Sequence, residues 1–77
     1  MTNILIVEDD PLIAELERDF LEANDYVVHM TENGADALQL LDESQIDAIL
    51  LDIMLPGEDG YALCRKMREK TDIPIIL

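Results

Sequence analysis

The chain is short of cysteine, aromatic residues and bases, and each shortage excludes a class of protein. Its single cysteine, Cys64, cannot form a disulfide within the chain, which excludes a disulfide-stapled domain. Five Lys and Arg residues stand against 18 Asp and Glu residues, for a net charge of -13. Nucleic acids and anionic membranes are bound through basic patches, so we expect this segment to bind neither of them directly.

Long hydrophobic runs are absent as well. No stretch approaches the roughly 20 apolar residues that a membrane-spanning helix requires, and no charged leader followed by an apolar stretch marks secretion. The sequence therefore predicts a soluble protein of a reducing compartment, the cytoplasm. Hydrophobic residues make up 49% of the 77 residues, which favours a folded chain, and this length permits one small domain with little margin in its core.

Short aliphatic runs alternate with segments of helical periodicity along the chain. The runs predict four strands, at Asn3–Val7, Tyr26–Met30, Ile46–Ile53 and Ile73–Leu77. Between them the pattern predicts three helices: one from Pro11 to about Asn24 with Asp10 as its N-cap, one that Asn33-Gly34 opens, and one over Gly60–Lys70 with Asp59 as its N-cap. This β-α-β-α-β-α-β order predicts an α/β fold in which a parallel sheet has helices on both faces.

Each predicted helix has apolar residues at helical spacing. They form one stripe on the first helix (Leu12, Ile13, Leu16, Phe20 and Leu21), the inward face of the second (Ala37, Leu38 and Leu41) and the candidate buried side of the third (Tyr61, Leu63, Cys64 and Met67). Four of the five bases gather in the last half of the third helix, where the helix dipole favours cations.

Three acids stand where predicted strands end: Glu8 and Asp9 after the first strand, and Asp52 near the end of the third. The carboxyl ends of parallel strands meet at one edge of a sheet, so we expect these carboxylates to crowd together. Crowded carboxylates either raise their pKa values or bind a cation, and hard oxygen ligands suit Mg2+. The alternative for an acid at a strand end is helix capping, which we assign to Asp10.

Three segments carry a family resemblance: ILIVEDDP over residues 4–11, ILLDIMLPGEDGY over residues 49–61 and DIPIIL over residues 72–77. In order and spacing they resemble the receiver domain of a two-component response regulator. The resemblance implies a flavodoxin-like, doubly wound parallel sheet. Residues 1–77 would form a partial receiver domain with four strands and three helices.

The resemblance also implies a phosphoacceptor, Asp52, which takes a phosphoryl group from a phosphohistidine on a sensor histidine kinase or phosphotransfer protein. It implies that Asp9, Asp52 and the main-chain carbonyl of Met54 bind Mg2+, while Glu8 completes the pocket through a water. Mg2+ can neutralise the incoming phosphoryl oxygens and hold the attacking carboxylate in line. Such a protein is a signalling acceptor rather than an enzyme, and at most assists its own phosphorylation and dephosphorylation.

The loop after Asp52 is rich in turn residues. Pro56 fixes φ, Gly57 can adopt conformations closed to other residues, and Asp59-Gly60 starts the next helix. We expect this loop to hold the Met54 carbonyl toward the metal, and an ordinary strand-to-helix connection is the alternative.

Partner contacts are less sharply encoded. The resemblance implies that the kinase or phosphotransfer protein docks near the active-site edge, with Leu12, Ile13, Ala14 and Pro56 as candidate contacts. The alternative is packing, because apolar residues are common at the start of any helix.

The chain departs from the family at its last strand. Receiver domains normally have five strands and five helices, whereas this sequence stops inside the fourth strand. A serine or threonine expected just beyond Leu77, and a lysine at the end of a fifth strand, have no counterpart in it. We expect a truncation; a fragment completed by self-association through the exposed fourth strand, or a natural short protein, are the alternatives.

Two other function classes share features with this sequence. A haloacid-dehalogenase-type phosphatase also places an aspartate after an apolar strand, but it has a second aspartate where this sequence has Met54. An interaction module that occupies a kinase without being phosphorylated remains open. His29 and Cys64 are interpreted as structural residues, because the sequence gives neither of them a catalytic partner.

Overall fold

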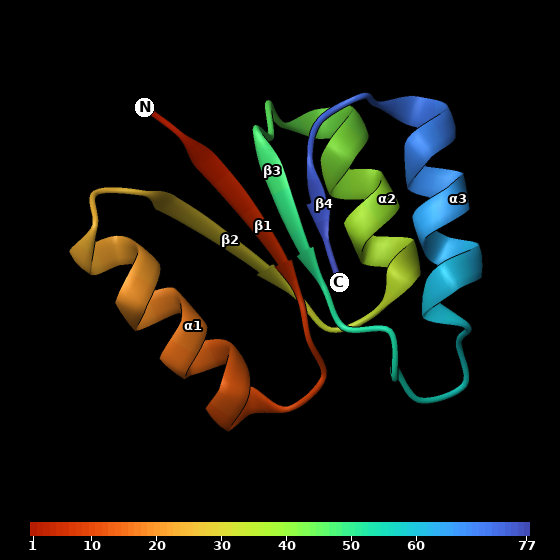
Figure 1. Cartoon of the computed structure of the whole chain (residues 1–77), viewed down its shortest axis with the longest axis horizontal. Helices are drawn as coiled ribbons and strands as arrows, with labels where there is room; N and C mark the ends of the chain where they lie inside the picture. The colour runs from red at the N-terminus through yellow and green to blue at the C-terminus, as the bar shows by residue number, and fades with distance from the viewer.

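The computed structural model describes residues 1–77 and contains four strands and three helices in strict alternation (Figure 1). In chain order these are β1 (Asn3–Val7), α1 (Pro11–Ala23), β2 (Val27–Thr31), α2 (Gly34–Glu43), β3 (Ala48–Leu51), α3 (Gly60–Lys70) and β4 (Ile75–Ile76). The predicted element order is therefore confirmed. None of the three helices combines the length and the apolar character needed to cross a membrane.

The four strands form one parallel sheet in the order β2-β1-β3-β4. Figure 1 shows α1 on one side of the sheet and α2 and α3 together on the other. The chain thus winds in one direction from β1 to β2 and in the opposite direction from β2 to β3. The predicted doubly wound α/β fold is confirmed, and the reversal places the carboxyl ends of β1 and β3 side by side.

The core lies on the α2 and α3 side of the sheet. Alternate residues of β1 and β3 point to this side because side chains along a strand alternate between faces. The buried cluster consists of Leu5, Val7, Ala37, Ile46, Ile49, Leu51, Leu55, Leu63 and Met67. Leu38, Leu41 and Cys64 pack against it, as predicted. Tyr61 is a wrong prediction, because it is more than half exposed at the first turn of α3.

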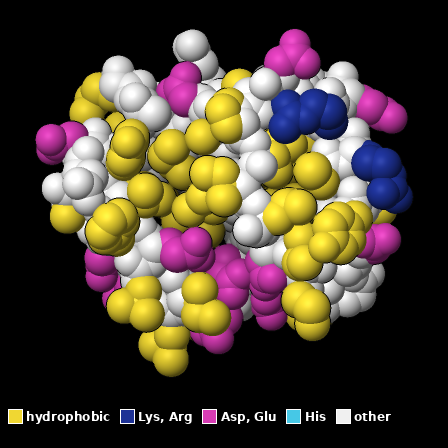
Figure 2. All heavy atoms as spheres, in the orientation of Figure 1, with side chains coloured by type: hydrophobic (Ala, Val, Ile, Leu, Met, Phe, Trp, Pro, Cys, Tyr) yellow, Lys and Arg dark blue, Asp and Glu magenta, His cyan; other side chains and the backbone are white.

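The opposite side of the sheet is thinly covered. On α1 only Ala14 is buried, and on β1 Ile4 and Ile6, which alternate with the core residues Leu5 and Val7, are buried as well. The predicted apolar stripe exists, but Leu12, Leu16 and Phe20 are each at least 70% exposed, so most of it faces solvent. Figure 2 shows hydrophobic side chains spread across this face of the molecule.

Three of the four strands differ from prediction by one or two residues at each boundary, for identifiable reasons. The second strand begins one residue later, after a turn in which Asp25 has φ 68. The third is trimmed to Ala48–Leu51, although Asp47 still donates its N–H to the Asn3 carbonyl at 2.7 Å. The fourth is only Ile75–Ile76, preceded by Pro74, which has no N–H to donate.

The predicted caps are all present. The carboxylate of Asp10 accepts from the N–H of Leu12 at 2.9 Å, and Asp59 accepts from Tyr61 at 2.9 Å. Asn33 caps α2 by accepting from the Asp36 N–H. His29 lies in β2, where its Nε2 is 3.1 Å from the side-chain oxygen of Asn3, consistent with a structural role.

Candidate metal centre

Two backbone hydrogen bonds deliver the acids to one end of the sheet. The N–H of Glu8 donates to the Thr31 carbonyl of β2 at 3.0 Å, and the N–H of Asp52 donates to the Val7 carbonyl of β1 at 3.0 Å. Pairing therefore continues one residue past β1 and past β3. Both acids enter the site from extended backbone that the sheet holds rigidly.

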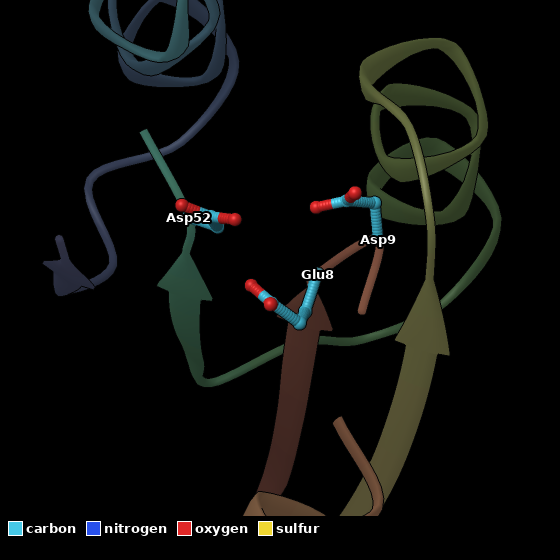
Figure 3. Close-up of side chains that lie close together, drawn as sticks. All are labelled: Glu8, Asp9 and Asp52. Carbon is cyan, nitrogen blue, oxygen red and sulfur yellow. The ribbon is translucent and has the colours of Figure 1, made fainter. Parts of the chain in front are cut away.

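Three carboxylates converge at this end, as predicted. Figure 3 shows Asp9 and Asp52 on either side of the tip of β1, with Glu8 between them. One oxygen from each of the three side chains lies within 4.8 Å of the other two. In Figure 2 acidic side chains gather at the same end, below the hydrophobic face. None of the four ion pairs in the structure involves Glu8, Asp9 or Asp52.

This concentration of negative charge is electrostatically costly for Glu8. Its side chain is only 8% exposed. Burial, followed by a hydrogen bond with the Asp52 carboxylate and the Asp52 charge, raises the pKa of Glu8 to about 7. The Asp10 backbone N–H opposes this effect and the Asp9 charge adds to it. A proton on Glu8 relieves the repulsion when no cation is bound.

The donor set fits a hard divalent cation. The carboxylate oxygens come from one buried, one exposed and one half-buried side chain, which leaves room for the water ligands that Mg2+ usually retains. Softer metals prefer thiolate and imidazole ligands, and the cluster contains neither.

The loop from Asp52 to α3 has the turn geometry that its sequence predicts. Gly57 has φ +70, a conformation that L residues with a Cβ rarely adopt. At Gly60 a Cβ would overlap the Ile53 backbone, so the two segments approach too closely for any side chain. The N–H of Met54 donates to Asp52 Oδ1 at 2.9 Å. The loop thus holds both the acid and the backbone that follows it.

The candidate partner contacts separate into two groups. Leu12, Ile13 and Pro56 are exposed. Ala14 is only 6% exposed, because it is the residue through which α1 packs on the sheet. For Ala14 the burial supports the packing alternative, and contact with a partner stays a prediction for the other three residues.

Two residues near the site were missed by sequence reasoning. Glu17 lies on α1 and lines, with Glu8 and Asp52, a cavity of about 320 Å³. Burial and the Asp52 charge raise its pKa. Its position four residues after Ile13 places both on one helix face, and this spacing was the available signal. Glu58 contacts α2 from the loop, a long-range contact that no local pattern encodes.

Sequence comparison assigns a family to these features. The family model for the response regulator receiver domain matches residues 4–77. The transcriptional regulatory protein ResD of Bacillus subtilis is 45% identical over 76 residues, which are 99% of this chain and 32% of that protein. BaeR of Escherichia coli, also a transcriptional regulatory protein, is 45% identical over 75 residues, 97% of this chain and 31% of that protein. The chain spans about a third of the length of these curated relatives.

Solved structures agree on the fold. The response regulator TrrA of Thermotoga maritima, in complex with Mg(2+)-BeF, superposes with a TM-score of 0.93 at 37% identity, over 100% of this chain and 68% of that one. TrrA in a complex with the histidine kinase ThkA gives a TM-score of 0.90 at 36% identity, over 97% of this chain and 66% of that one. The flavodoxin-like receiver arrangement predicted from sequence is therefore confirmed for the four strands and three helices described above.

Proposed function

Because this chain belongs to the response regulator receiver family, we propose that Asp52 is a phosphoacceptor whose phosphorylation requires Mg2+. Asp9, Asp52 and the Met54 carbonyl are the proposed metal ligands, and Glu8 acts through a water. The observation that most directly supports this proposal is the convergence of the three carboxylates, with one oxygen of each within 4.8 Å of the others. Receiver domains are signalling modules, and we assign this chain that role in the cytoplasm.

In the proposed reaction, Asp52 is the nucleophile. A carboxylate oxygen attacks phosphorus, the P–N bond to the donor histidine breaks, and its electron pair returns to the ring nitrogen. The product is an acyl phosphate on Asp52. The Met54 N–H, which holds Oδ1 at 2.9 Å, keeps the carboxylate from rotating and leaves the other oxygen without a backbone donor.

Mg2+ would supply charge neutralisation of the phosphoryl oxygens, which a carboxylate cluster cannot provide by itself. The carboxylate side chains of this chain supply the binding site for Mg2+. TrrA, a structural relative, has been solved in complex with Mg(2+)-BeF, which supports the same cation for this chain. Glu8 is buried at the cluster, and we propose that it accepts a hydrogen bond from a metal-bound water.

The proposed phosphodonor is a sensor histidine kinase or a phosphotransfer protein. This assignment is supported by the family match and by the solved complex of TrrA with the histidine kinase ThkA. Leu12 and Ile13 at the start of α1, with Pro56 from the loop, are the exposed apolar residues that we propose for contact with the donor.

A labelling experiment tests the phosphoacceptor directly. The chain is incubated with Mg2+ and acetyl phosphate, and intact mass is measured for one phosphoryl addition. The addition should be absent in Asp52→Asn and present in Asp72→Asn, which removes an equal charge from an exposed residue. If the wild-type chain stays unlabelled under conditions that label a five-stranded receiver, the phosphoacceptor proposal is wrong for this chain.

A second candidate is an interaction module that binds a kinase or its own copies without being phosphorylated. It is favoured by the position of β4, which pairs only with β3 and leaves its other edge open. Ile76 and Leu77 are 57% and 58% exposed there. An open, apolar edge strand is a template for pairing with another chain.

A further inference from the structure

Glu58 ties the loop after Asp52 to a helix that is distant in sequence. Both of its carboxylate oxygens lie 3.0 Å from the backbone nitrogen of Gly34, the first residue of α2. Gly34 is buried and Glu58 is half-buried. Among the hydrogen bonds of residues 53–58, only this contact reaches an element that does not adjoin the loop in sequence.

The chemistry at the start of α2 suits a carboxylate. The first N–H groups of a helix have no partner within it, and the Asn33 side chain satisfies only the N–H of Asp36. The Gly34 N–H is therefore free for Glu58. Helix N-termini carry partial positive charge, and hydrogen bonds to an ionised acceptor are stronger than those between neutral groups.

Gly34 and Glu58 are fitted to one another in space. A Cβ at Gly34 would overlap Glu58 Oε1 and crowd the side chain of Leu63. The absence of a side chain at residue 34 thus makes room for the carboxylate. Gly34 has no positive φ, so the close approach of Glu58 and Leu63 accounts for the glycine.

Glu58, which accepts the hydrogen bond from Gly34, is the last residue of a small turn, Leu55–Glu58. The N–H of Glu58 donates to the Leu55 carbonyl at 3.2 Å, and Leu55 is buried in the core. Between Asp52 and this turn lies Met54, whose side chain is 80% exposed and therefore cannot anchor the backbone by packing. The backbone at Met54 is held by its bond to Asp52, by the close approach of the preceding Ile53 to Gly60, and by the contacts that fix the Leu55–Glu58 turn.

We propose that Glu58 is a positioning residue for the metal centre: by fastening the Leu55–Glu58 turn to α2, it holds the Met54 carbonyl where Mg2+ is bound. This rests on the proposed function, because it presumes that Met54 is a ligand. Glu58 itself does not contact the metal. It acts through the backbone, as residues that orient metal ligands do.

Isothermal titration with Mg2+ tests the proposal in the full chain. Residues that orient ligands typically cost 10- to 100-fold in metal affinity when removed, and we expect about tenfold for Glu58→Ala. Glu58→Gln keeps an acceptor oxygen and should lose only about threefold or less. Glu69→Ala is the matched control, since it removes an equal charge from an exposed residue of α3 and should bind Mg2+ like the wild type.

Amide hydrogen exchange supplies a readout that needs no metal. In Glu58→Ala the Met54 N–H, bonded to Asp52, should exchange faster, while amides of β1 should be unchanged. A purely structural role would lower the urea midpoint and leave Mg2+ affinity and Met54 exchange as in the control. That result, in a folded variant, overturns the proposal. If the wild type binds no Mg2+, the proposed function itself is wrong. If the wild type binds Mg2+ and Glu58→Ala binds it equally well, only the proposal for Glu58 is wrong.

Discussion

The backbone N–H of Asp52 donates to the Val7 carbonyl at 3.0 Å. This bond extends the pairing of β1 with β3 by one residue and fixes Asp52 opposite the end of β1. Glu8 follows Val7 directly, so the register of two strands determines the separation of two carboxylates. A slip of one residue would turn Asp52 to the other face of the sheet and destroy the site.

Mg2+ should stabilise the folded chain. When an ion binds only the folded state and its free concentration is about 100 times its dissociation constant, it adds about 2.7 kcal/mol to the free energy of unfolding. Asp9→Ala should remove this gain because it deletes a proposed ligand, while Asp36→Ala, an exposed acid of α2, should keep it. Melting temperatures with and without Mg2+ measure the effect, and equal values for the wild type would contradict the metal site.

Without metal, stability should fall as pH rises toward neutrality. The pKa of Glu8 is about 7 in the folded chain against 4.5 for the ordinary group, so between these values the folded state binds more protons than the unfolded state. The contribution is complete below about pH 4.5 and is lost above about pH 7. Glu17, whose pKa is also raised, acts in the same direction.

Urea denaturation in EDTA across this window measures the effect. Glu8→Gln cannot ionise, so its free energy of unfolding should fall less steeply with pH than that of the wild type. Glu69→Gln should follow the wild type, because this residue is exposed on α3. Parallel curves for wild type and Glu8→Gln would show that Glu8 does not carry the dependence.

Two loop glycines should differ in their tolerance of substitution. Gly60→Ala drives a Cβ into the Ile53 backbone and should cost about 1–3 kcal/mol of stability, as overpacking does. Gly57 has open space around it and requires only a positive φ, which Asn accepts more readily than other residues. Gly57→Asn should therefore cost less than Gly60→Ala in urea denaturation, and the reverse order would contradict this account.

If the open edge of β4 drives association, the chain should form dimers or larger species as its concentration rises. Ile76→Glu places a charge on this edge and should shift sedimentation velocity toward the monomer. Phe20→Glu changes an apolar residue on α1 that is even more exposed, and it should leave association unchanged. Dissociation by Phe20→Glu alone would locate the contact on α1 instead.

Element order, caps and the acid cluster were predictable because they depend on local signals. Asp10 and Asp59 cap helices with their own side chains, and the carboxyl ends of parallel strands lie at one edge of a sheet. The family resemblance then supplied the roles of Asp52 and Asp9, which remain to be tested by experiment.

Features that depend on what covers a surface were not predictable. Leu16 and Phe20 have the spacing of a buried stripe, yet periodicity reports only that a face is apolar, not that something lies over it. Ala14 shows the opposite: its small side chain gives no strong hydrophobic signal in the sequence, yet it is the buried residue of α1. The pairing of Glu58 with Gly34 joins residues 24 positions apart, beyond any local rule.

The one-sided core has a consequence for how the molecule opens. Nine buried side chains join β1 and β3 to α2, α3 and the loop, whereas α1 is fixed to the sheet by Ala14 alone among its own buried residues. Local unfolding follows the least packed element, so α1 should detach while the rest of the molecule stays folded. Asp9 lies in the short segment that joins β1 to α1, and Asp52 directly follows β3. A cation bound by both carboxylates would therefore oppose the detachment of α1.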